Sequence, residues 1–184
     1  FLELDGVRPF DLTLVYGTNA QISGGTLAAI RARGPLVAVM CLDDKQSFED
    51  VKPQRSWQGG QLPLIGSAHV HLTNARECLR WYDYHGASAA YWPEAANPLF
   101  GVCSASAKDI DVSFVGQSYG IRKAFVKALR KRGITVRCFG SGWENPFVSD
   151  EEMFGIFARS KINLGMGNVG YSTSLTCLKG RDFD

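Results

Sequence analysis

A glycine-flanked turn in the second half of the sequence contains the residue types that bind anions. The motif "GQSYG" follows the apolar run "DVSFV" and supplies Gly116, Gln117 and Tyr119, and Arg122 comes shortly after it. Where such a turn joins a strand to a helix, backbone N–H groups and the positive helix end face an anion. A cation in the first helical turn opposes the helix dipole by about 0.3–1 kcal/mol, so Arg122 and Lys123 are poorly placed for stability alone. A bound phosphate would reverse that sign.

The same segment also allows a different interpretation, because it is basic along its whole length. Its six cations are Arg122, Lys123, Lys127, Arg130, Lys131 and Arg132. They could form a solvated helix face that begins at Arg122, or a nucleic-acid-binding surface. The formal charge of only +2 and the absence of interleaved exposed aromatic residues argue against nucleic acid as a partner.

A second glycine motif, "GMGNVG" at residues 165–170, has the G-x-G-x-x-G spacing of dinucleotide-binding turns. That fingerprint belongs to the first strand of a βαβ unit and requires an acidic residue about 20 positions later. Here the following "YSTSLTCLKGRDFD" is a weak helix and no further strand follows. A nicotinamide or flavin site is therefore disfavoured, although this loop is expected on the ligand-binding side of the sheet.

Two adjacent carboxylates, Asp43 and Asp44, end the apolar run "LVAVMCLDD" and are candidates for a general base. If the sheet is parallel, both lie at the carboxyl end of a buried strand, where ligands bind. The alternative is that one of them caps the next turn, which we favour slightly for Asp43. His69 and His71 share one strand face, and a structural role is favoured for both. A zinc site and disulfides are not expected from five widely spaced cysteines, of which Cys41 and Cys138 lie inside apolar runs.

The elements that must position these residues alternate between strands and helices, as in βα units around a parallel sheet. In the first half, strands are expected within residues 10–17, 36–44, 68–74 and 88–92. Helices are expected around residues 27–33 and 75–86, and His85 is expected near the end of the second.

In the second half, strands are expected at residues 111–116, 134–140 and 161–165. A helix over residues 121–132 is expected to bury an apolar face. The members of that face are Ala124, Phe125, Ala128 and Leu129. Ser149 and Glu152 in "SDEE" form a predicted capping box for the next helix. That helix has Met153, Phe154, Ile156 and Phe157 on its apolar side.

The composition is that of a soluble α/β protein, with 45% apolar and 21% charged residues. A cytoplasmic location is expected because no signal-peptide pattern and no membrane span is found. Residues 93–108 are rich in Pro, Ala and Ser, which indicates a linker between two domains. The first domain is expected over residues 1–100 with a crossover at about 97–108, and the second over 109–184. Both sheets are expected to be incomplete, because such domains usually contain more strands.

The ordered blocks of the second domain resemble a known family. "DVSFVGQSYGIRKAFVKALRKRGITVRCFGSGW", "SDEEMFGIFARSKINLG" and "LKGRDFD" are similar to the central part of the CgeB-type (spore maturation protein-like) glycosyltransferase family in the GT-B superfamily. The upstream "FDLTLVYG", "VAVMCLDD" and "YWPEAANPLF" resemble that family's first domain and crossover. The resemblance implies two Rossmann-like domains across a cleft, with a nucleotide-sugar donor held mainly by the second.

The resemblance also implies roles for individual residues. Gly116, Gln117, Tyr119 and Arg122 would lie near the donor diphosphate or the transferred sugar. Gly140 and Trp143 would lie beside the nucleotide. Lys179 and Arg181 would be cations near the diphosphate. Asp184 stands where such enzymes usually have a glutamate that accepts ribose hydroxyl hydrogen bonds, and the shorter side chain puts that contact in question.

The expected function is metal-independent transfer of a sugar from a nucleotide-diphosphate-sugar to an unknown acceptor, which could be a glycan, a protein or a small molecule. No cofactor or metal is expected, because cations and helix-end amides can stabilise a leaving phosphate. The alternative is a non-catalytic nucleotide-sugar-binding or scaffold protein on the same fold. Because the chain starts at Phe1 and stops at Asp184, we expect it to be an inactive piece of a longer enzyme.

Overall fold

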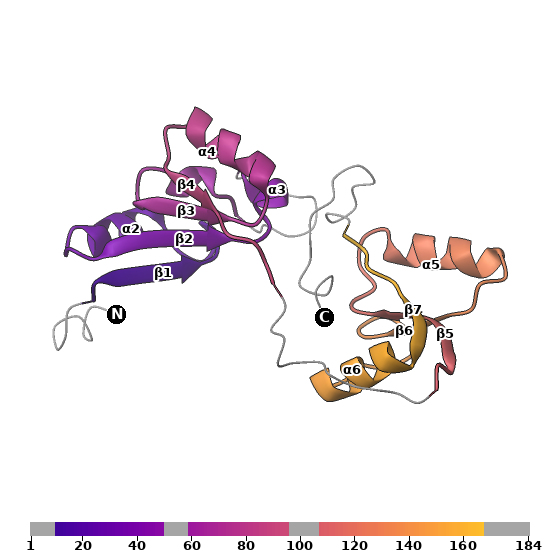
Figure 1. Cartoon of the computed structure of the whole chain (residues 1–184). Coiled ribbons are helices and arrows are strands. Elements are labelled where there is room, and N and C mark those ends of the chain that lie inside the picture. The colour runs from indigo at the N-terminus through magenta and orange to yellow at the C-terminus, as the bar shows by residue number, and fades with distance from the viewer. Residues whose placement is uncertain (1–9, 50–58, 96–106, 168–184) are drawn as a thin grey trace. The chain divides into compact units, whose positions relative to one another are not determined.

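The computed structural model describes residues 10–49, 59–95 and 107–167. The chain divides into two compact units, Phe1–Pro93 and Glu94–Asp184. Each unit contains its own parallel β-sheet with connecting helices, so the predicted α/β class with two parallel sheets is confirmed (Figure 1). Most of the predicted crossover, residues 96–106, lies outside the described residues.

The first unit has a four-stranded parallel sheet in the order β1-β2-β3-β4. Its strands are β1 (Leu12–Tyr16), β2 (Leu36–Cys41), β3 (Val70–Thr73) and β4 (Ala89–Tyr91). Its α-helices are α2 (Gly24–Arg31), α3 (Asp44–Ser47) and α4 (Leu79–Tyr84), and its 3₁₀ turns are η1 (Leu62–Leu64) and η2 (Arg76–Cys78). All four strands lie in segments where the sequence predicts them.

The helices of the first unit pack on one face of the sheet. Leu27 from α2 packs with Val37 and Val39 of β2. On the same face, Tyr82 of α4 stacks on His71 of β3, which is the register partner of Val39. Each successive strand lies next to the previous one in the same direction across the sheet, and each connection is right-handed. All connecting helices therefore lie on the same face of the sheet.

The opposite face of this sheet is apolar, and it is exposed along its β1 edge. Leu12, Leu14 and Tyr16 of β1 are 56%, 50% and 62% exposed, and Leu36 of β2 is 59% exposed. The middle of β2, where Val37, Ala38 and Val39 are all buried, is covered on both faces.

The second unit has three parallel strands in the order β6-β5-β7. They are β5 (Ile110–Val115), β6 (Val136–Phe139) and β7 (Ser160–Asn163), joined by α5 (Arg122–Lys131) and α6 (Asp150–Arg159). The chain leaves β5 towards one edge through α5, and returns past β5 to the other edge through α6. The two helices therefore lie on opposite faces of the sheet (Figure 1).

The buried face of α5 differs from the predicted one. Val126 is 1% exposed and Arg122 is 3% exposed, whereas Phe125 is 45% exposed. Ala124 is also exposed, and only Leu129 of the predicted face packs partly against the core. The prediction was wrong because the side of α5 that packs on the sheet contains Arg122, Val126 and Leu129, which are four and three residues apart. Phe125 does not lie on that side.

Local signals at the helix ends are confirmed. Ser149 accepts a hydrogen bond from the Glu152 amide, and the Glu152 side chain accepts one from the Ser149 amide, which is the predicted capping box of α6. His85 occupies the C-cap of α4, as predicted. None of the described helices is long and apolar enough to cross a membrane.

Candidate functional site

The turn between β5 and α5 lies at the topological switch point of the second sheet. The connection through α5 leaves β5 on one side and the connection through α6 returns on the other, so the loops after β5 and β7 diverge from neighbouring strand ends. In open parallel sheets, ligands bind at this position. Met166, in the loop after β7, packs with Phe114 and Val126, which places the described part of the second glycine motif beside the first turn.

Three backbone amides of this turn are available to a ligand. The N–H groups of Gln117, Tyr119 and Gly120 donate no hydrogen bond to any described part of the chain. By contrast, the N–H of Gly116 donates to the Phe139 carbonyl over 2.9 Å and the N–H of Ser118 donates to the Ser141 carbonyl over 3.0 Å. The turn is therefore held at two of its amides and leaves three others at the ligand-binding edge.

Gly140, in the turn after β6, lies directly against the first turn. Its φ angle is +118°, and a Cβ at this position would be 2.7 Å from the Gly116 carbonyl oxygen and 3.0 Å from the Gly116 carbonyl carbon. Any side chain here would push Gly116 away. The resemblance predicts a nucleotide contact for Gly140. In the structure, its lack of a side chain allows the two turns to pack closely.

Trp143 also contacts the Gly116 carbonyl. Its indole Nε1 donates to the Gly116 oxygen over 2.8 Å, and its ring packs edge-on against Phe114 with centroids 5.8 Å apart. Trp143 is half-buried in the core beneath α5. It therefore fixes the carbonyl at the end of β5.

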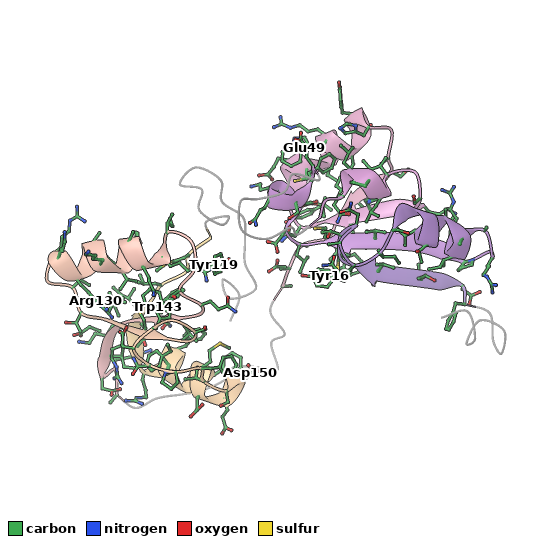
Figure 2. The ribbon with its side chains drawn as sticks, turned by 180° about the vertical axis from the view of Figure 1, so that it is seen from behind. Tyr16, Glu49, Tyr119, Arg130, Trp143 and Asp150 are labelled. Carbon is green, nitrogen blue, oxygen red and sulfur yellow. The ribbon has the colours of Figure 1, made fainter. Side chains whose placement is uncertain are left out.

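Arg122 is buried and bonds to the turn itself. Its guanidinium donates to the Gln117 carbonyl over 2.8 Å and to the Tyr119 hydroxyl over 3.2 Å. It also lies 4.0 Å from the centre of the Tyr119 ring. Figure 2 shows Tyr119 at the end of α5 where the helix begins and Arg130 towards its other end. Arg122 is thus not the first residue of a solvated basic face, and it brings positive charge beside the three amides.

One further residue that packs against the turn, Gly142, was not singled out from the sequence. Gly142 has a φ of +81°, and a Cβ there would be 2.1 Å from the Ser118 hydroxyl oxygen. The repeated glycine of "GSGW" was the available signal, because two glycines spaced by one residue at a strand end indicate close backbone packing.

The adjacent carboxylates Asp43 and Asp44 have opposite environments. Asp44 is fully buried and its Oδ2 accepts a hydrogen bond from the Tyr82 hydroxyl over 3.3 Å. Burial raises the pKa of Asp44, and the hydrogen bonds that it accepts only partly offset this rise. Asp43 is exposed at the N-cap of α3, where its carbonyl accepts from Ser47 but its side chain makes no capping bond. Of the two, Asp43 is the carboxylate that solvent reaches.

The histidines of the first unit have structural contacts, as favoured from the sequence. His71 is 1% exposed, stacks on Tyr82 with ring centroids 4.9 Å apart, and burial lowers its pKa to about 4. His69 accepts a hydrogen bond through Nδ1 from the Val37 amide over 2.9 Å. The thiols of Cys41 and Cys138 are buried, as predicted.

Three of the predicted donor-binding residues, Lys179, Arg181 and Asp184, lie outside the described residues, as does the end of the second glycine motif. No protein-family model, no curated protein and no solved structure matches this chain. Its function is therefore inferred from the geometry of the described residues.

Proposed function

We propose that the second unit binds the diphosphate of a nucleotide sugar at the turn between β5 and α5, and that the protein is a metal-independent glycosyltransferase of the GT-B type. The observation that carries the proposal is the set of three available amides, Gln117, Tyr119 and Gly120, at the switch point and at the start of a helix. Anions bind where unpaired N–H groups and a helix N-terminus coincide.

The energetics favour an anion over a neutral ligand. Each hydrogen bond to a charged group contributes about 1.5–3 kcal/mol, and the helix end adds about 0.3–1 kcal/mol. Three amides would thus supply on the order of 5–9 kcal/mol before the entropic cost of binding. The buried Arg122 guanidinium adds charge close to the turn and holds it through the Gln117 carbonyl. These contributions suit a diphosphate, which presents several anionic oxygens.

The proposed chemistry breaks the bond between the anomeric carbon and the diphosphate oxygen. The electron pair stays with the diphosphate, and the turn amides together with Arg122 stabilise the charge that develops there. An oxygen of the acceptor hydroxyl forms the new bond to the anomeric carbon, and its proton passes to a base. Of the two carboxylates that the sequence offers as candidates for this base, Asp43 is exposed and Asp44 is buried.

The alternative proposal is a protein that binds the nucleotide sugar without transferring the sugar. The same amides and the same Arg122 would serve that function, because binding requires no base. Turnover therefore separates the two. Release of nucleoside diphosphate during incubation with acceptor mixtures would support transfer, and tight binding without release would support the alternative.

Binding is tested by calorimetric titration of the protein with uridine, guanosine, adenosine and cytidine diphosphates and their sugar conjugates. Arg122→Ala should weaken binding of the preferred ligand by roughly 10- to 100-fold, which corresponds to about 1.5–3 kcal/mol. Arg132→Ala is the matched control, because it removes one cation from the same segment but lies outside the turn. Unchanged affinity in Arg122→Ala, or equal losses in both variants, would refute the proposed site.

A further inference from the structure

A surface groove of about 590 Å³ lies beside α5, between the helix and the turn after β6. Residues on the helix side are Lys123, Val126, Lys127, Arg130 and Lys131, and residues on the turn side are Gly142, Trp143 and Glu144. Figure 2 labels Arg130 and Trp143, which come from the two walls. The volume falls within the range of about 300–1,000 Å³ that is typical of small-molecule sites.

The cations of the helix wall share one side of α5. At about 100° per residue, Lys123, Lys127, Arg130 and Lys131 fall within an arc of roughly 100°. Arg132 falls about 100° beyond the edge of this arc. The row from Lys123 to Lys131 extends about 12 Å along the helix axis. The groove therefore has positive charge along its length.

The charge in this groove is poorly balanced by protein groups. Among the described residues, Glu144 is the one carboxylate in its walls, and it forms an ion pair with Arg130. Arg130 also donates to the Val136 carbonyl over 2.6 Å. Lys123, Lys127 and Lys131 form no ion pair with any described residue. Like charges four residues apart destabilise a helix by about 0.2–0.5 kcal/mol per pair, so this row lowers stability in the absence of an anion.

The turn wall of the groove includes Gly142 and Trp143. Trp143 is fixed by its hydrogen bond to the Gly116 carbonyl and by its contact with Phe114, so its ring is a rigid part of the wall. Aromatic rings next to rows of cations are typical of sites for nucleotide bases and phosphates.

We propose that this groove is a second anion site, distinct from the turn at the switch point, and that it binds an oligophosphate group, either free or carried by a nucleoside. Three ammonium groups spread over about 12 Å suit several phosphates in a row. Carboxylates are best matched by the planar fork of an arginine, and here the one arginine of the groove is already held by Glu144. Lysines act as point charges and suit phosphate oxygens. The proposal does not depend on sugar transfer.

Titration with tripolyphosphate and with ATP tests the proposal. Lys127→Ala/Lys131→Ala should bind tripolyphosphate at least about tenfold more weakly than the natural protein, because each ammonium makes a charge-assisted contact. Arg132→Ala removes a cation outside the groove. It should change the affinity less than about twofold, because salt screens exposed charges at a distance. Because tripolyphosphate would also bind the turn that Arg122 holds, the lysine variant is compared with its parent in the Arg122→Ala background, and the tenfold difference should persist there.

The two sources of the phosphate group are distinguished by comparing ATP with tripolyphosphate in the Arg122→Ala background. If ATP binds more tightly there, the nucleoside contributes to binding and the ligand is a nucleotide. If both ligands bind equally, the groove recognises the oligophosphate alone. No binding of either ligand at millimolar concentration would overturn the proposal. So would an Arg132→Ala loss as large as that of the lysine variant, or a lysine effect that disappears in the Arg122→Ala background.

Discussion

Replacing Gly140 by alanine tests whether the contact between the two turns shapes the proposed diphosphate site. The new Cβ would be 2.7 Å from the Gly116 carbonyl oxygen and 3.0 Å from its carbon, and both atoms are backbone. It would also place a side chain at a φ of +118°. Backbone strain of this kind costs on the order of 1–3 kcal/mol, and the steric overlap adds a further 1–3 kcal/mol as in an overpacked core. The expected loss is therefore about 2–6 kcal/mol in the stability of the second unit.

Gly34→Ala provides a control for the strain alone. Gly34 has a φ of +113°, which is close to that of Gly140, but a Cβ there would meet no atom within 4 Å. Its expected cost is the strain contribution of about 1–3 kcal/mol. The difference between the two variants then measures the contact between Gly140 and Gly116.

Hydrogen exchange followed by mass spectrometry is the appropriate assay, because it reports on each unit separately. Peptides from β5 and β6 should lose protection in Gly140→Ala, and peptides from β1 and β2 should lose protection in Gly34→Ala. Gly140→Ala should also weaken nucleoside diphosphate binding, because a displaced Gly116 moves the amides that follow it. If Gly140→Ala costs no more than Gly34→Ala and leaves diphosphate affinity unchanged, the contact between the turns does not order the site.

Three further predictions concern single residues. Burial lowers the pKa of His71 to about 4, below its unfolded value of about 6.5, so its stability contribution is present above pH 6.5 and is lost as the pH falls towards 4. Between pH 7 and 4.5 this loss of unfolding free energy is about 2 kcal/mol. Urea unfolding of His71→Leu should no longer show this pH dependence. An unchanged pH dependence would show that His71 is not its source. The pKa of Asp44 is raised, so its contribution to stability is lost as the pH rises above about 4. Asp44→Asn should therefore stabilise the protein more at pH 7 than at pH 4. Equal effects at both pH values would argue against a buried carboxyl group. Asp43→Asn should abolish sugar transfer in product assays while calorimetry shows unchanged donor binding, and retained transfer would exclude Asp43 as the base.

The sequence by itself determined the local elements. Alternation of apolar residues identified the strands, and the capping box of Ser149 and Glu152 identified the start of α6, because both depend on contacts between residues close in the chain. The turn at Gly116 was also recognisable, since a glycine turn between a strand and a helix has a backbone-level signature.

Tertiary structure decided how these elements are used. Asp43 and Asp44 are neighbours, yet one is exposed and the other is buried against Tyr82, which lies 38 residues away in the chain. Burial of this kind depends on which helix packs on the strand end, and a single sequence carries no signal for that choice.

The same reason explains the wrong prediction of the buried face of α5. The helical period was recognisable from the sequence, but the side that packs on the sheet is set by β5 and β6, so Arg122 and Val126 are buried and Phe125 is not. The strand order β6-β5-β7 also depends on long-range pairing, such as the hydrogen bond from Ser113 to Asn163 across 50 residues. This order makes β5 and β7 neighbours, so the loops after them begin at adjacent strand ends, because strands that are distant in the chain become neighbours when their backbones pair.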